Sequence, residues 1–322
     1  SGTLACPAIA PGEKAVLRRD GAPLTNIEVI SVYTGLARAV RHGSDYFVRP
    51  DDLKPLPVPE VRFDDLGRLA EVAGIALTHP ELDLWRAPTD NDRGWHRLDL
   101  KWEEAGLHRL QTRIDRTEVL ENGGRRVEAR VGPPAKRYAF RTVTTIQPVP
   151  GGVRVEFEAS PEKEWPGEVA RLGVRFAVPA PFSARTFAGL GPEEAYPDMR
   201  SKGVMGWHSV NLWNRPLLHD IPERPQEYGA HPETTRVLFT APRNQRLEID
   251  CETPLTFTAR PFTSAQLAAA RHAKDLVPDG KTYVNLDVAH RGLGSNSCGP
   301  DVADEFRLPV RPFRLAFVIR IA

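Results

Sequence analysis

Proline and glycine recur along the whole chain and limit the folds that it can adopt. Of the 322 residues, 30 are proline and 25 are glycine. Proline fixes φ and lacks a backbone donor, so it is tolerated in turns and edge strands but rarely inside helices. A fold made of many long helices is therefore excluded, and we expect an all-β protein.

Strand-length segments of alternating apolar and polar residues follow one another along most of the chain. The clearest are residues 126–131, 138–146, 153–159, 172–178, 236–240, 255–259 and 313–321. Alternation with a period of two places successive side chains on opposite faces of a strand. One face then enters a core while the other carries Arg, Glu and Thr, so the pattern predicts a large sandwich of stacked antiparallel sheets.

Helical patterns are few. Ser264 is a good N-cap for residues 265–274, which are rich in strong helix formers, and residues 100–106 form a weaker candidate. The chain lacks the strand and helix alternation that a (β/α)₈ barrel requires. We therefore expect no such barrel within this sequence.

The first 57 residues differ from the rest of the chain. Short apolar runs separated by turn residues predict four or five strands and a small SH3-like β-barrel over residues 1–57. Proline then alternates with other residues, which is typical of a stiff, extended connector, here placed at 58–62. Residues 63–322 form the second predicted domain.

Charge and cysteine content limit the partners and the compartment. The 43 Lys and Arg residues nearly balance 42 Asp and Glu residues, so no overall field favours nucleic acid or an anionic membrane. Cys6, Cys251 and Cys298 are too few for a disulfide framework. With no apolar run long enough to span a bilayer and no signal-peptide pattern, we expect a cytoplasmic protein.

Four segments contain more polar, glycine and proline residues than a sandwich needs, and we expect each to be a loop. They are LWRAPTDNDRG (84–94), GLGPEEAYPD (189–198), RPQEYGAHPETTR (224–236) and RGLGSNSCGP (291–300). None matches a phosphate-binding loop, a dinucleotide-binding turn or a serine-hydrolase elbow. Cofactor chemistry is therefore not expected.

Two hypotheses apply to the first of these loops. Asp90, Asn91 and Asp92, together with Arg86, offer the acceptors and donors that a cation or a sugar hydroxyl needs. The same residue types also form turns that satisfy their own hydrogen bonds, which is the more common outcome. The loop is therefore interpreted as structural, with binding as the alternative.

The other three loops allow similar alternatives. Glu193, Glu194 and Asp198 suit an acid and base pair or a charged surface loop. The third loop suits a sugar-binding edge or structural hydrogen bonding, through Gln226, Glu227, Tyr228 and His231. Cys298 has no neighbouring histidine that would activate it as a nucleophile.

In this order and spacing, the four segments resemble the C-terminal domain of the β-galactosidases of glycoside hydrolase family 2, which also occurs as a separate small subunit. The resemblance rests on WRAPTDND (85–92), GLGPEEAYPD, RPQEYG and GLGSNSCGP (292–300), and covers residues 61–322. It implies a galactose-mutarotase-like supersandwich that completes the active site of a catalytic (β/α)₈ barrel. Such hydrolases use two carboxylic acids, and in this family both lie on the barrel. The resemblance thus implies hydrolysis of terminal β-galactosides, with no catalytic residue in this chain and no activity in the isolated chain.

The resemblance also carries expectations for individual residues. Cys298 matches the place where the family's last loop reaches the active-site mouth beside the aglycone, and Ser297 and Asn296 are candidates to bind a second sugar. The other motif residues are expected to be structural: Arg86, Asp90, Asn91, Asp92, Tyr196, Gln226, Glu227 and His231. Family members use Mg²⁺ and Na⁺, with ligands mainly outside this domain, so no metal or cofactor is assigned to this chain.

Two alternatives remain from the sequence alone. A carbohydrate-binding module without hydrolase function would use the same loops, and an aldose mutarotase would need a Glu and a His in one pocket. A sandwich that covers a barrel is also expected to expose a large apolar patch, which predicts aggregation or oligomerisation of the isolated chain.

Overall fold

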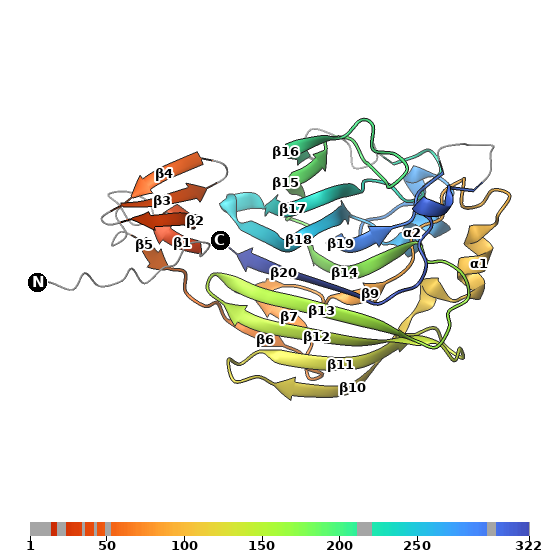
Figure 1. Cartoon of the computed structure of the whole chain (residues 1–322), viewed down its shortest axis with the longest axis horizontal. Helices are drawn as coiled ribbons and strands as arrows, with labels where there is room; N and C mark the ends of the chain where they lie inside the picture. The colour runs from red at the N-terminus through yellow and green to blue at the C-terminus, as the bar shows by residue number, and fades with distance from the viewer. Residues whose placement is uncertain are drawn as a thin grey trace, which may run out of the picture.

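The computed structural model describes residues 14–17, 24–33, 36–41, 44–48, 53–210, 221–294 and 301–321. These residues form antiparallel strands with two short α-helices and a few 3₁₀ turns, which confirms the expected all-β class (Figure 1). The helices are α1 (Leu98–Glu104) and α2 (Ser264–Ala269). The strands are β1 (Lys14–Leu17), β2 (Leu24–Tyr33), β3 (Leu36–Arg41), β4 (Ser44–Val48), β5 (Leu53–Pro55), β6 (Val61–Phe63), β7 (Leu69–Val72), β8 (Ile75–Ala76), β9 (Glu81–Asp83), β10 (Gln111–Val119), β11 (Arg125–Gly132), β12 (Ala139–Val149), β13 (Gly152–Glu162), β14 (Arg171–Pro179), β15 (Ala184–Gly191), β16 (Val204–Val210), β17 (His231–Thr240), β18 (Arg246–Arg260), β19 (Lys281–His290) and β20 (Phe313–Ile321).

Strands β1 to β5 form a sheet of their own. Their order is β4-β3-β2-β1-β5, and Figure 1 shows this sheet to one side of the larger one. Within the described residues β4 and β5 are its edges, and closure of the sheet into the expected barrel stays a prediction.

The segment that follows β5 contacts the larger sheet. Leu56 is buried, and the carbonyl of Pro57 accepts a hydrogen bond of 2.9 Å from the amide of Gly151, at the turn between β12 and β13. Strand β6 begins at Val61, so the last two residues of the expected connector belong to a strand. A small sheet of β6, β7 and β8 follows.

The large sheet is a branched supersandwich. Its main path runs β10-β11-β12-β13-β20-β18-β17-β15-β16. Strand β18 has 15 residues, and its two halves pair with different neighbours: Leu247–Cys251 with β20, and Thr256–Arg260 with β19. Strands β14 and β9 continue beyond β19 as a second arm. All seven predicted strand segments overlap observed strands.

The core fills the space between the second arm and the main path. On β14, Val174, Phe176 and Val178 face the same side, as the period of two requires. The ring of Phe176 stacks on Phe317 of β20, with ring centroids 5.6 Å apart and planes 8° from parallel. Burial of each such aromatic side chain contributes roughly 1.5–3 kcal/mol. The hydrophobic effect thus holds the second arm face to face with the main path of the sheet.

Two sequence expectations about local structure were wrong. Thr263, not Ser264, is the N-cap of α2, because Thr263 is extended and its side chain accepts from the amide of Gln266 in a reciprocal capping box. The helix ends at Ala269, because Ala270 is again extended.

Among the described residues, no helix has the length and apolar character needed to cross a membrane.

Two of the expected loops contain strand residues. Gly189 to Gly191 belong to β15, and residues 231–236 of the third loop lie in β17, which begins at His231. Pairing with β16 and β17 overrides the weak strand propensity of glycine. Glycine is needed at 189 because a Cβ atom there would lie 2.6 Å from Oγ1 of Thr234.

Candidate functional site

A buried arginine ties the first motif to the fourth. The Arg86 side chain is fully buried and donates to both carboxylate oxygens of Asp92, through Nε at 3.0 Å and Nη2 at 2.7 Å. Its remaining donors reach the carbonyls of Arg291 at 2.8 Å and Gly292 at 3.0 Å. Charge-assisted, bidentate pairs of this kind have specific geometry. Arg86 therefore sets the position of the backbone at 291–292.

Two further side chains hold the next turn of that backbone. Nδ2 of Asn91 donates to the carbonyls of Leu293 at 3.1 Å and Gly294 at 2.7 Å. The Asp198 carboxylate, from the second motif, accepts from the amides of the same two residues at 2.9 and 2.7 Å. A Cβ atom at Gly292 would lie 2.8 Å from Cγ of Asp198, so the approach requires glycine there.

The third motif closes the cluster. The backbone amide of Glu227 donates to the carbonyl of Ala87 at 3.1 Å. Oε1 of Gln226 accepts from the amide of Asp90 at 2.8 Å. The amide of Ala195 donates to the carbonyl of Ala230 at 2.8 Å and so joins the second motif to the third. We call these four joined segments the motif cluster: 84–94, 189–198, 224–236 and 291–294.

The motif cluster also fixes both ends of the segment 295–300. Arg291 precedes it, and its guanidinium donates to the carboxylates of Glu168 and Asp301. Asp301 follows it, and its backbone amide donates to Nε2 of His96 at 3.0 Å. The candidate substrate-binding residues of the sequence analysis lie outside the described residues: Asn296, Ser297 and Cys298. Contacts of described residues thus hold the chain on both sides of them.

A buried ionic network lies beneath the motif cluster. Glu227 is fully buried and accepts from Arg171 at 2.7 Å and from Arg260 at 2.9 Å. Burial opposes ionisation of Glu227, but the charges of the two arginines outweigh it and lower its pKa to about 2. Burial lowers the pKa of neighbouring His290 well below its usual value, so this imidazole is neutral. Glu227 is therefore the anion that balances two buried cations.

Asp287 is the second buried acid of this network. One of its oxygens lies 3.5 Å from Nη1 of Arg171. Burial raises the pKa of Asp287 to about 7; Arg171 opposes this shift, and the charges of Asp83 and Glu227 add to it. The folded protein therefore holds a proton on Asp287 that the unfolded chain releases near its ordinary pKa of 3.8.

This proton makes stability depend on pH. For an acid whose folded pKa is raised, the stabilisation is complete below the unfolded pKa and is lost as pH rises through about 7. Asp287→Asn keeps a neutral side chain at all pH values. We compare the free energy of unfolding of the variant minus that of the parent at each pH. This difference is expected to be larger at pH 8 than at pH 5, by about 2 kcal/mol.

Urea unfolding at the two pH values measures this difference. Asp275→Asn is the control, because its carboxylate caps an exposed turn through the amides of Arg271 and His272. An equal relative stability of Asp287→Asn at both pH values would contradict a proton on Asp287 in the folded state.

The remaining sequence candidates occupy different environments. Glu193 and Glu194 are exposed in the second motif. Tyr196 is buried, and its ring packs edge-on against His290, with centroids 5.3 Å apart. His231 is buried against Phe187, with centroids 4.2 Å apart, and burial lowers its pKa to about 3. Within the described parts of the chain, no group of three or more His, Cys, Asp or Glu side chains is arranged to hold a metal ion.

Sequence reasoning missed most of the ionic network. Arg171, Arg260, Asp287 and His290 lie in or at the ends of the strands β14, β18 and β19. A charged residue inside an otherwise apolar strand, as in VNLDVAH around Asp287, is the signal that could have found them. Their pairing could not be seen, because the partners are far apart in the sequence.

Comparison with known proteins agrees with the motifs. The chain is 30% identical over 283 residues to a β-galactosidase of Arthrobacter sp. (strain B7), which covers 80% of this chain and 27% of that protein. It is 31% identical over 240 residues to a β-galactosidase of Lactobacillus delbrueckii subsp. bulgaricus, covering 73% and 23%. The chain thus spans about a quarter of the length of these relatives.

A galactose mutarotase related enzyme from Lactobacillus acidophilus aligns over 84% of this chain and 97% of its own, with 7% identity and a TM-score of 0.42. The family described as "Beta galactosidase small chain" matches residues 61–319. The chain therefore belongs to the β-galactosidase small-chain family.

Proposed function

We propose that this chain is the C-terminal or small-subunit portion of a β-galactosidase, and that it completes an active site whose catalytic glutamates lie on a (β/α)₈ barrel outside it. The observation that carries the proposal is the motif cluster, in which Arg86, Asn91 and Asp198 converge on the backbone at 291–294. Nothing in a sandwich requires side chains from two distant loops to fix one short segment of a third loop. Such anchoring suits a loop that must be held in place against a substrate.

The anchored loop would form the aglycone wall of the active site. Asn296 is two residues after Gly294, whose amide donates to Asp198 and whose carbonyl accepts from Asn91, and Ser297 and Cys298 follow it. The side chain of Cys298 offers less surface to a sugar or an aromatic aglycone than a tryptophan at this position would. The loop would therefore orient the leaving group mainly through hydrogen bonds and exclude water from one side.

The partner would be the catalytic portion of the enzyme, docked on the surface beside the motif cluster. Large apolar side chains are exposed there: Trp95, three residues after Asp92, is 89% exposed, and Trp207 on β16 is 46% exposed. A tryptophan that is this exposed is typical of a surface that a partner covers. The length of the relatives leaves about three quarters of a β-galactosidase to supply that partner.

Hydrolysis of a chromogenic β-galactoside tests the proposal. We expect no activity from this chain alone, and activity when it is mixed with the Arthrobacter sp. β-galactosidase from which the matching quarter has been deleted. Trp95→Ser is the matched variant: it leaves the fold intact because the side chain is exposed, and it is expected to weaken the complementation. Activity of the isolated chain, or physical association of the two parts without activity, would contradict the proposal.

A further inference from the structure

The second arm of the sheet has a polar face. Glu81 of β9 lies directly opposite Arg175 of β14, which in turn lies opposite Asn285 of β19. Residues in register on antiparallel strands point to the same face. Their neighbours Leu82 and Val174 point to the other face and are buried in the core. A row of polar groups therefore crosses three strands.

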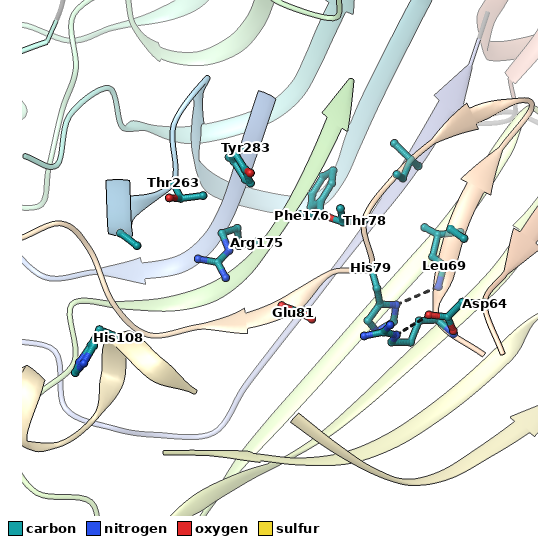
Figure 2. Close-up of a pocket in the computed structure, with 14 residues that line it drawn as sticks. Asp64, Leu69, Thr78, His79, Glu81, His108, Arg175, Phe176, Thr263 and Tyr283 are labelled. Carbon is teal, nitrogen blue, oxygen red and sulfur yellow. Dashed lines mark hydrogen bonds and ion pairs between the residues drawn. The ribbon is translucent and has the colours of Figure 1, made fainter. Parts of the chain in front are cut away.

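At one end of this polar face the side chains are buried and bonded to one another, and at the other end they border a cavity. Asn285 donates to the buried Asp83 at 2.8 Å, and beyond them lies the ionic network beneath the motif cluster. At the outer end, a cavity of about 580 Å³ is bounded by the small sheet, η2 (Leu107–Arg109), α2 and the strands β9, β14 and β19 (Figure 2). Small-ligand sites have volumes of roughly 300–1,000 Å³.

One half of the cavity is occupied by groups that satisfy one another. Nδ1 of His79 accepts from the amide of Leu69 at 3.2 Å, and Nε of Arg68 donates to Asp64 at 2.7 Å, as the dashed lines in Figure 2 show. Burial lowers the pKa of His79 to about 4, so this half carries no net charge. It provides a wall but no free binding groups.

Two charged side chains in the other half have no partner within the described part of the chain. Neither the Glu81 carboxylate nor the Arg175 guanidinium makes a hydrogen bond or an ion pair there, although both border the cavity (Figure 2). The Tyr283 ring lies in the same half, with its hydroxyl already bonded to Asp279. This half therefore offers one free anion, one free cation and an aromatic ring held in place.

We propose that this cavity is a second binding site, separate from the motif cluster, and that it binds a neutral saccharide. An anion would meet the Glu81 carboxylate, and a cation would meet the Arg175 guanidinium, so a ligand with a net charge gains from one group and loses to the other. Sugar hydroxyls both donate and accept, so adjacent hydroxyls satisfy both groups. The apolar face of a sugar ring packs on an aromatic ring such as Tyr283.

Isothermal titration of the 322-residue chain with galactose and with lactose tests the proposal. A ligand of this size is expected to bind with a Kd on the order of millimolar. Glu81→Gln keeps the shape of the side chain and removes its charge, and Arg175→Gln removes the cation; each is expected to weaken binding about tenfold. Arg200→Gln is the control, because its exposed pair with Glu233 lies outside the cavity.

Three results would overturn the proposal: absence of saturable binding by either sugar, unchanged affinity in both cavity variants, or tighter binding of glycine than of either sugar. The last result would identify a site for zwitterions instead. Thermal melting of each variant checks that the fold is retained. Because this titration uses no partner, its failure would be distinct from a failure of complementation.

Discussion

Replacement of Glu227 by glutamine is expected to lower the free energy of unfolding by about 3–5 kcal/mol, because it removes one partner of a buried ion pair. Glu227 is fully buried and is the shared acceptor of Arg171 and Arg260. Glutamine retains one acceptor oxygen and places an NH₂ group against a guanidinium. Two buried cations would then lose the carboxylate that they share, and only Asp83 and Asp287 would remain near Arg171.

Urea unfolding at pH 7 measures this loss. Glu60→Gln is the matched control, because Glu60 pairs with Arg62 at 2.9 Å while both side chains are more than 60% exposed. Exposed pairs contribute about 0–1 kcal/mol. Similar losses in the two variants would show that Glu227 is not a buried counter-ion.

The sign of the pH dependence gives a second readout of the same residue. The folded pKa of Glu227 lies near 2 and below its ordinary 4.5. For such an acid, the stabilisation is complete above the unfolded pKa and is lost as pH falls toward 2. The difference between parent and Glu227→Gln should therefore shrink on acidification below about pH 4.5.

Replacement of Asp198 by alanine is expected to lower kcat/KM of the complemented β-galactosidase by roughly a hundredfold, because small displacements of positioning groups have effects of this size. The Asp198 carboxylate accepts from the amides of Leu293 and Gly294, at the start of the proposed aglycone loop. Asp198 is a positioning residue in this proposal, since it acts through the loop. Its loss should cost stability only about 1–3 kcal/mol.

A matched control separates this effect from general loosening of a loop. Asp275→Ala also removes a carboxylate that accepts from two backbone amides, those of Arg271 and His272, in the exposed turn after α2. We expect its kcat/KM to remain unchanged. Asp198→Asn retains one acceptor oxygen and should recover part of the activity. Equal kcat/KM for Asp198→Ala and the parent would remove the link between the anchored loop and catalysis.

Much of the fold was predictable, because strand alternation is a local property. The predicted strand segments 172–178 and 313–321 lie in β14 and β20. Strands β15 and β16 were not predicted, because glycines weaken the local signal. Pairing of β15 with both β16 and β17 stabilises the extended backbone there. The N-cap of α2 was missed by one residue because neighbouring Thr263 and Ser264 are both good caps.

The sequence alone determined the all-β class, the four motifs and the relationship to β-galactosidases, because alternation and motif order can be read along one chain. Tertiary structure decided which polar residues are buried and what they bind. Asp198 and Glu227 are both acids in glycine- and proline-rich segments, yet one holds a loop backbone and the other balances two buried arginines. The difference comes from desolvation and from partners about 30 to 100 residues away in sequence, and both depend on how the strands are brought together.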